Sequence, residues 1–213
     1  MVVPATESGI LHVYREGLRP TDIRMLESLD SGTQLHSVRV GSLATSVVRS
    51  SGMIINHDVT AAFYLHDIAK SVPPFRELAC SPNVFTREEE AVMRWHPVVG
   101  HKLLLHKGMP NEAARLVRWH HEKYNGTGYP DGLKGEEIPL LVAVLTAADV
   151  FDAMVDNHRG YRKPCDLETA LRRLKALGGT ELNPTAVEMV LNTFPLWGSN
   201  GYTDLLKLEN NSF

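Results

Sequence analysis

The chain has 213 residues with a formal net charge of −3, and 43% of the residues are hydrophobic. This length predicts one domain, and the apolar share is enough for a folded core, which excludes a disordered chain. There is no basic excess to bind a nucleic-acid polymer, and the longest uncharged apolar run, residues 138–148, is too short to cross a membrane. With two cysteines and no visible signal peptide, we expect a soluble protein of the reducing cytoplasm.

The spacing of apolar residues is helical along most of the chain. We expect a lead-in segment over residues 1–20 and one domain over residues 21–213. The pattern predicts an amphipathic helix pair over residues 26–47 and a helical stretch over 59–69, which ends near Ser71 because two prolines follow. Residues 74–85 are predicted to be a loop. Further helices are predicted over residues 86–95, 97–108, 111–123, 139–153, 167–177 and 183–194, with a turn at 197–200 and a short C-terminal helix.

Two local signals refine this pattern. Thr86 followed by Glu89 is typical of a capping box that opens a helix. Residues 125–135, with the sequence NGTGYPDGLKG, are dense in glycine and proline and predict a compact loop with several turns. The sequence shows no convincing β alternation. It therefore predicts an all-α bundle of about eight to ten helices with one Gly/Pro-rich loop.

Several of the ten histidines fall, with two aspartates, within or beside these helices and among apolar neighbours: His36, His66, Asp67, His96, His120, His121 and Asp149. A single inward-facing histidine is more often a satisfied core residue than a metal ligand. A whole set is harder to explain in that way, because buried polar groups need partners and an aspartate beside several histidines is stable only when a cation compensates its charge. Imidazole and carboxylate ligands together suit Fe, Mn, Zn or Ni. The remaining histidines are interpreted as surface or ordinary core residues: His12, His57, His101, His106 and His158.

Adjacent pairs in this set carry further information. Neighbouring side chains on a helix diverge by about 100°, so His66 and Asp67 are not placed to chelate one ion as residues four apart would be. They suit two ions with the carboxylate as a bridge, and His120-His121 repeats the arrangement. Two metal ions about 3.5–4 Å apart activate water and bind a phosphoryl group. Lys70 is expected on the same helix face, where it would stabilise a phosphate or a leaving oxygen; the alternative is a solvated lysine at a helix end.

These residues also form a family signature. The segment His66-Asp67-Ile68-Ala69-Lys70 resembles the HD-x-x-K core of the HD superfamily of metal-dependent phosphohydrolases. Residues 120–139, with the sequence HHEKYNGTGYPDGLKGEEIP, resemble the defining block of the HD-GYP subfamily, and ADVFDA at 148–153 continues it. The resemblance covers approximately residues 30–190, in the order and spacing of the family.

The resemblance implies an all-α HD-GYP domain that hydrolyses the bacterial second messenger cyclic di-GMP to pGpG and on to GMP. It implies two divalent metal ions, typically iron or manganese, bridged by Asp67. Lys70 matches the family lysine near the scissile phosphate, so the resemblance assigns catalytic roles to Asp67 and Lys70. One ion would be held by His36, His66, Asp67 and Asp149, and the other by Asp67, His96, His120 and His121.

Two other segments that resemble the family are expected to contact the substrate and protein partners. Residues 159–162 resemble a family segment whose basic residues hold the phosphates, and the alternative for Arg159 and Arg162 is a solvated charged turn. Gly128, Tyr129 and Pro130 belong to the GYP loop, which in the family is linked to protein contacts, including contacts with diguanylate cyclase (GGDEF) domains. Their alternative role is turn chemistry alone. Whether the chain forms a homodimer is left open.

Three departures from the family pattern affect these expectations. Some members hold a third metal ion through a glutamate four residues before the first histidine, but Gly32 occupies that position here, which predicts a site for two ions. Gly160 replaces a family proline and predicts a looser phosphate site. Residues 74–85, a segment that often acts as a lid, also differ from the common pattern.

The leading hypothesis is a cyclic di-GMP phosphodiesterase, and two alternatives stay open. The chain would be a receptor or interaction module if it bound cyclic di-GMP or a synthase while turning over too slowly to matter. It would be a phosphodiesterase for another nucleotide, such as cyclic GMP-AMP, if the residues that contact the bases selected adenine. The motifs do not contain the residues that contact the bases, so the sequence does not distinguish cyclic di-GMP from another cyclic dinucleotide as the substrate.

Overall fold

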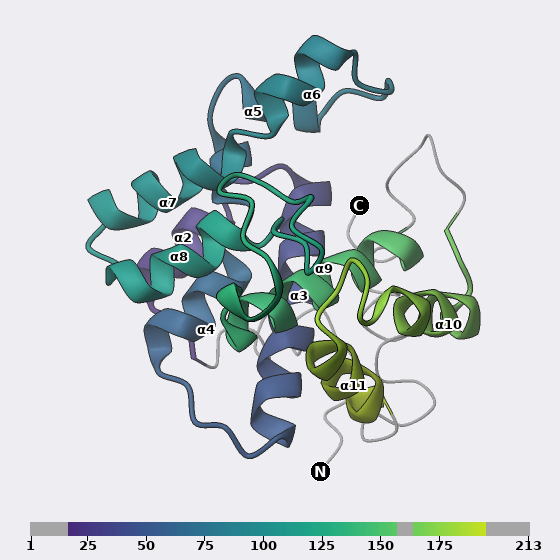
Figure 1. Cartoon of the computed structure of the whole chain (residues 1–213). Coiled ribbons are helices and arrows are strands. Elements are labelled where there is room, and N and C mark those ends of the chain that lie inside the picture. The colour runs from purple at the N-terminus through teal and green to yellow at the C-terminus, as the bar shows by residue number, and fades with distance from the viewer. Residues whose placement is uncertain (1–16, 157–163, 195–213) are drawn as a thin grey trace.

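The computed structural model describes residues 17–156 and 164–194, and the regular elements within these ranges are helices (Figure 1). The only β pairing in the described residues is an isolated bridge between Gly178 and Leu182. The all-α prediction is therefore confirmed. The α-helices are α2 (Pro20–Leu26), α3 (Ser31–Ser50), α4 (His57–Tyr64), α5 (Phe75–Ala79), α6 (Arg87–Met93), α7 (His96–His106), α8 (Asn111–Trp119), α9 (Leu140–Val155), α10 (Leu167–Leu177) and α11 (Pro184–Thr193), and two 3₁₀ turns are η1 (Ile68–Ser71) and η2 (Gly135–Glu137).

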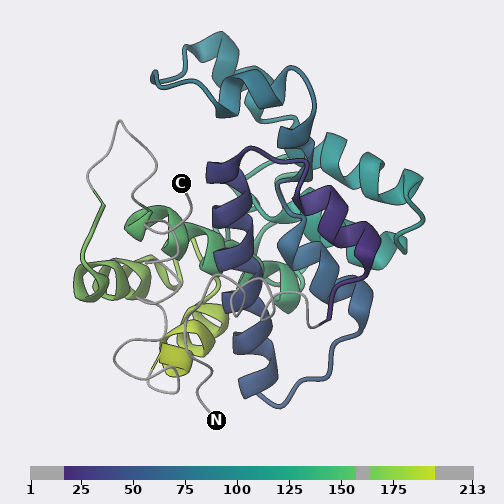
Figure 2. The same cartoon turned by 180° about the vertical axis from the view of Figure 1, so that it is seen from behind.

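Helix α3 is the central element of the bundle. It is the longest helix of the described chain and packs against α4, α9 and α11, as Figures 1 and 2 show from opposite sides. Leu43 and Val47 of α3, Phe63 of α4 and Phe151 of α9 are all fully buried in the shared core. Burial of each such side chain stabilises the fold by about 1.5–3 kcal/mol before the loss of chain entropy is counted. Helices α3 and α4 approach closely at Gly41, where an added Cβ would lie 2.5 Å from the Tyr64 ring.

Side-chain caps explain where many of the helices begin. In each case an oxygen of the capping side chain accepts a hydrogen bond from the backbone N–H three residues on, which satisfies one of the unpaired donors of the first turn. The predicted capping box at Thr86 and Glu89 is present. The capping residues are Asp30 for α3, Asn56 for α4, Thr86 for α6, Asp166 for α10 and Asn183 for α11.

Three predicted element boundaries are wrong. The segment 74–85 is not simply a loop, because α5 lies within it; this helix packs against η1, and its Phe75 side chain is buried. The helical stretch predicted for residues 59–69 ends at Tyr64, and the helix predicted for 111–123 ends at Trp119. Each of these helices ends within two residues of a histidine of the predicted metal set, His66 after α4 and His120 after α8.

The arm formed by α5 and α6 stands away from the rest of the bundle (Figures 1 and 2). Helix α6 has no buried residue, and Val84 and Trp95 on either side of it are mostly exposed. The predicted turn at 197–200 and the C-terminal helix lie outside the described residues, as does most of the lead-in segment. Among the described residues, no helix combines the length and the apolar character needed to cross a membrane.

Candidate metal centre

Three histidines of the predicted set lie just past the ends of helices, not on helix faces. His66 follows α4, His96 follows α6 and begins α7, and His120 follows α8. In each, Nδ1 bonds to the carbonyl oxygen three residues earlier, at 3.1 Å for His66, 2.7 Å for His96 and 2.7 Å for His120. The imidazole thus caps a carbonyl near the end of the preceding helix, a group that the helix itself leaves unpaired. Because Nδ1 carries the hydrogen, Nε2 of each ring carries a lone pair.

The fourth imidazole is held by a carboxylate. His36 lies in α3, and its Nδ1 donates to Oδ2 of Asp152 in α9 at 2.7 Å. Its Nε2 lies 3.1 Å from Oδ1 of Asp149, one helical turn earlier in α9. The contact between α3 and α9 therefore turns Nε2 of His36 toward the other predicted ligands.

The ligand atoms form two groups that meet at Asp67. One group contains His36, His66 and Asp67, and the other contains His96, His120 and His121, with the atoms of each group within 4.8 Å of one another. Oδ2 of Asp67 lies 3.7 Å and 3.6 Å from Nε2 of His36 and His66. Oδ1 lies 3.2 Å and 3.8 Å from Nε2 of His96 and His120. Each carboxylate oxygen thus faces a different group, which is the arrangement a bridging ligand requires.

The prediction that His66 and Asp67 diverge on one helix is wrong, although both residues lie in the cluster. The two do not diverge on one helix, because α4 has ended and their ligand atoms converge to 3.6 Å. Asp149 has a linking position as well: Oδ1 faces His36, and Oδ2 lies 3.9 Å from Nδ1 of His121. The structure thus brings together all seven residues of the predicted set.

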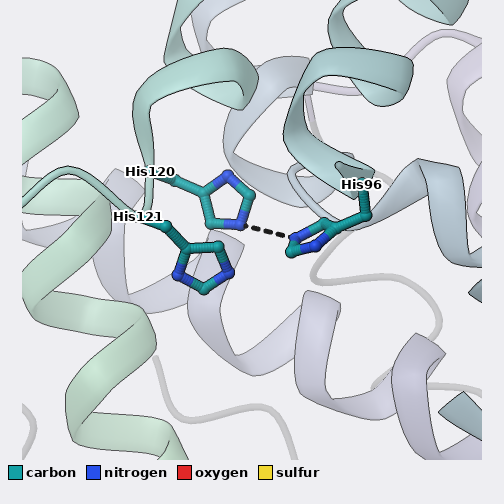
Figure 3. Close-up of side chains that lie close together, drawn as sticks. All are labelled: His96, His120 and His121. Atoms are coloured by element: carbon teal, nitrogen blue, oxygen red, sulfur yellow. Dashed lines mark hydrogen bonds between the residues drawn. The ribbon is translucent and has the colours of Figure 1, made fainter. Parts of the chain in front are cut away.

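Unpartnered atoms in this cluster fit a metal ion. Nε2 of His36, Nε2 of His66 and Oδ1 of Asp67 are buried and have no hydrogen-bond partner. Nε2 of His96 and Nε2 of His120 lie 3.3 Å apart, and Figure 3 shows how the two rings point at each other beside His121. Both Nδ1 hydrogens are donated to carbonyl groups, so two lone pairs face one another. A cation bound by these atoms would satisfy all of them, and imidazole with carboxylate is a donor set suited to Fe, Mn or Zn.

The protonation of the cluster favours metal binding. Burial, together with the nearby His66 and His96 rings, lowers the pKa of His120 to about 3. Burial also lowers the pKa of His66 and holds that of His121 well below its usual value. For Asp67, burial raises the pKa, but the Lys70 ammonium and His66 outweigh it, so the pKa lies well below its usual range. Neutral imidazoles and an ionised carboxylate are the forms that bind metal ions.

His36 shows how strongly this site attracts positive charge. Burial alone would lower its pKa, but the Asp149 and Asp152 carboxylates outweigh that effect and raise it to about 9. A protonated His36 ring would balance the negative charge of these carboxylates, and a bound metal ion would balance the same charge.

A pocket of about 640 Å³ opens onto the cluster. Its floor includes His36, Asp67, His96, His121 and Asp149, and its other walls come from the α3 N-terminus, α9 and the segment 78–85. The volume lies in the range of small-molecule sites. The segment of residues 74–85, which in the family often acts as a lid, therefore lines the pocket through residues between Leu78 and Phe85.

Two further residues of the prediction, Lys70 and Tyr129, line this pocket. Nζ of Lys70 donates to Oδ2 of Asp67 at 2.6 Å, and only 17% of its side chain is exposed, so the alternative of a solvated lysine is wrong. The Tyr129 ring lies 4.9 Å from the His121 ring, and the Arg94 guanidinium stacks on it at 4.3 Å. Tyr129 thus has a role beyond turn chemistry, as part of the pocket wall.

The loop of residues 125–135 is fixed to the backbone that carries His120 and His121. An added Cβ at Gly128 would lie 2.3 Å from the Lys123 nitrogen and 2.6 Å from the His121 oxygen, so no larger residue fits there without displacement. Glu122 is 1% exposed, and its carboxylate accepts from the N–H groups of Asp131, Gly132 and Leu133 at 2.7, 3.1 and 3.0 Å. No role was predicted for Glu122, although its position next to two predicted ligands, His120 and His121, was a usable signal.

Arg39, Asp152 and Asp156 were also missed. Arg39 and Asp152 each follow a predicted ligand by three residues on a helix, which was the available signal. His36, Asp152 and Asp156 form a third group of converging ligand atoms. Arg39 already supplies the cation of that group, with Nη2 at 2.9 Å from Asp156 and Nε at 2.7 Å from Asp152.

The remaining predicted residues lie elsewhere. Arg159, Arg162, His12 and His158 are outside the described residues. The other histidines are away from the cluster, as expected: His57 contacts Asp22 at 2.8 Å, His101 contacts Asn111 at 3.0 Å, and His106 is exposed.

Comparison with known proteins agrees with this geometry. A profile of the HD domain family matches residues 22–186. A cyclic di-GMP phosphodiesterase of Thermotoga maritima is 37% identical over 78% of this chain and 45% of its own length. The cyclic di-GMP phosphodiesterase response regulator RpfG of Xanthomonas campestris is 35% identical over 79% of this chain and 45% of its own length. The chain thus spans less than half the length of these relatives.

Solved structures agree on the fold. An HDG"Y"P protein from Bdellovibrio bacteriovorus superposes with a TM-score of 0.61 at 18% identity, over 78% of this chain and 54% of the other. A cyclic GMP-AMP specific phosphodiesterase of Vibrio cholerae gives a TM-score of 0.61 at 18% identity, over 86% of this chain and 51% of the other. The chain therefore belongs to the HD domain family.

Proposed function

We propose that this domain is a metal-dependent phosphodiesterase that hydrolyses cyclic di-GMP to pGpG, GMP or both, in bacterial second-messenger signalling. The observation that carries the proposal is Asp67, whose two oxygens face two groups of imidazoles at the floor of an open pocket. The relatives named as cyclic di-GMP phosphodiesterases support the choice of substrate. The proposed catalytic domain covers residues 21–213, after a lead-in segment, and acts in the cytoplasm.

The proposed cofactor is a pair of divalent ions, iron or manganese, bridged by Asp67. When bound, such a pair lowers the pKa of a water molecule and stabilises charge on a phosphoryl group. His36, His66 and Asp149 would complete one position, and His96, His120 and His121 the other.

The side chains of the pocket have separate tasks in this proposal. Lys70 lies beside Asp67 with its ammonium group toward the cluster, where it would stabilise negative charge on the phosphate and the leaving oxygen. Tyr129 forms part of the wall against which the substrate would lie. Arg159 and Arg162 are proposed to hold the phosphates.

The direct test is to incubate the Mn- or Fe-loaded protein with cyclic di-GMP under reducing conditions and to follow pGpG and GMP by chromatography. The proposal predicts product formation, and Asp67→Ala should abolish both metal binding and turnover. Absence of product from protein with confirmed metal would refute the proposal, and saturable binding without hydrolysis would favour a receptor instead.

A second substrate is favoured by one specific comparison. A relative from Vibrio cholerae that is 29% identical over 81% of this chain is named a 3'3'-cGAMP-specific phosphodiesterase. The metal cluster acts on the phosphodiester, which all cyclic dinucleotides share, so the bases must decide the preference. A panel of cyclic di-GMP, cyclic GMP-AMP and cyclic di-AMP compared by kcat/KM separates the candidates.

Protein partners form the last part of the proposal. The loop with Gly128, Tyr129 and Pro130 is the proposed contact for diguanylate cyclase (GGDEF) domains, and a homodimer is the alternative assembly. Pull-down of a purified GGDEF domain, with Tyr129→Ala as the comparison, tests the first, and light scattering tests the second.

A further inference from the structure

Arg39 is a buried cation directly behind the metal cluster. It lies in α3, one helical turn after His36, and is only 1% exposed. A guanidinium is costly to bury unless carboxylates pair with it in good geometry. Arg39 has this pairing: Nε and Nη2 donate to the two oxygens of Asp152 at 2.7 and 2.9 Å, and Nη2 also lies 2.9 Å from Asp156.

Asp152 connects Arg39 to His36 by hydrogen bonds to both side chains. Its side chain is fully buried, and Oδ2 accepts both from Nη2 of Arg39 and from Nδ1 of His36, the latter at 2.7 Å. The bidentate pair fixes the plane of the carboxylate, and the carboxylate fixes the tautomer and ring angle of His36. The result is that Nε2 of His36 faces Asp67 and Asp149.

The other imidazoles are oriented without Arg39. His66, His96 and His120 donate Nδ1–H to backbone carbonyls of their own helix ends. In the group of His96, His120 and His121, the His96 and His120 rings are therefore held by backbone carbonyls and not by the Arg39–Asp152 pair. The two halves of the cluster are supported by different means.

We propose that Arg39 is a positioning residue for one half of the metal centre. Acting through Asp152 and His36, it sets the affinity of the position formed by His36, His66, Asp67 and Asp149, and it leaves the position formed by His96, His120 and His121 with its own support. This proposal rests on the two-ion centre of the proposed function. It concerns metal binding alone, so it can fail while the phosphodiesterase activity stands.

The test counts metal ions in purified variants of the 213-residue chain. Wild type, Arg39→Met, Arg39→Lys and Asp152→Asn are titrated with Mn²⁺ by calorimetry, and bound manganese is counted by mass spectrometry. Arg49→Met is the matched control, because Arg49 is an exposed arginine near the end of the same helix. Loss of such supporting contacts lowers metal affinity by about 10–100-fold.

The proposal predicts two ions in wild type and Arg49→Met. Arg39→Met and Asp152→Asn should keep one tight ion and bind the other about 10-fold or more weakly. Arg39→Lys should lie between them, since lysine cannot make the bidentate pair. Circular dichroism identifies any variant that does not fold. If Arg39→Met does not fold, the metal binding of Arg39→Lys and Asp152→Asn tests the proposal. Equal weakening of both ions, unchanged binding of both, or fewer than two ions in wild type overturns the proposal.

Discussion

At the scale of single residues, the cluster combines neutral imidazoles, those of His66, His120 and His121, with ionised carboxylates that are buried beside them. Burial holds the pKa of His120 at about 3, while Lys70 and His66 keep Asp67 ionised against the effect of burial. Lys70 has a second function in this account, because its ammonium group lines the pocket as well as pairing with Asp67. Substitution of Lys70 therefore tests whether turnover can be lost while the bound metal ions are kept.

We expect Lys70→Met to keep two bound ions and to lower kcat on cyclic di-GMP by about 10²–10³-fold, the usual effect of removing one donor to a developing oxyanion. Lys102→Met, at an exposed position on α7, should leave kcat unchanged. Metal content and steady-state kinetics measured on the same preparations check this. A Lys70→Met protein with wild-type turnover would contradict the role given to Lys70.

Several of these residues were predictable from sequence and others were not. The seven clustered histidines and aspartates were identified because their types and spacing are unusual, and the structure brings them together. The helix ends at Tyr64 and Trp119 were missed, because periodicity does not show that an imidazole will cap the preceding helix. Arg39 and Asp152 were missed as partners because they are 113 residues apart and meet only when α3 packs on α9.

At the scale of elements, the loop of residues 125–135 and the cluster share one piece of backbone. Gly128 lies against residues 121–123 too closely for a side chain, and Glu122 binds three successive N–H groups on the far side of the loop. The loop is therefore anchored to the backbone that carries His120 and His121. Its glycine and proline content was predictable, but its anchoring by a buried carboxylate was not.

We expect Glu122→Gln to lower the free energy of unfolding by about 1.5–3 kcal/mol, because a charged acceptor of three N–H groups becomes a neutral amide. Glu112→Gln, at an exposed position on α8, should change it by less than about 0.5 kcal/mol. Urea unfolding followed by circular dichroism measures both. Equal stability of the two variants would show that the loop is held by other contacts.

At the scale of the whole molecule, the centre joins segments from most of the bundle. His36 comes from α3, Asp67 precedes η1, His96 begins α7, His120 follows α8, and Asp149 lies in α9. A ligand that binds all of them binds the folded state and not the unfolded chain, so it must stabilise the fold. The structure thus predicts that stability and metal content are linked.

Removal of metal with a chelator should lower the melting temperature. At a free metal concentration 100 times Kd, one ion stabilises the native state by about 2.7 kcal/mol, which corresponds to roughly 5–10 °C for a domain of this size. Differential scanning fluorimetry with and without Mn²⁺ measures the shift. Asp67→Ala should show little response to Mn²⁺, and an equal response from it would place the ions elsewhere.

The most direct test of the central claim is an anomalous-scattering map from a crystal of the manganese-loaded protein. The account predicts two peaks separated by about 3.5–4 Å, one among His36, His66, Asp67 and Asp149 and the other among Asp67, His96, His120 and His121. A single peak, or peaks away from Asp67, would contradict it.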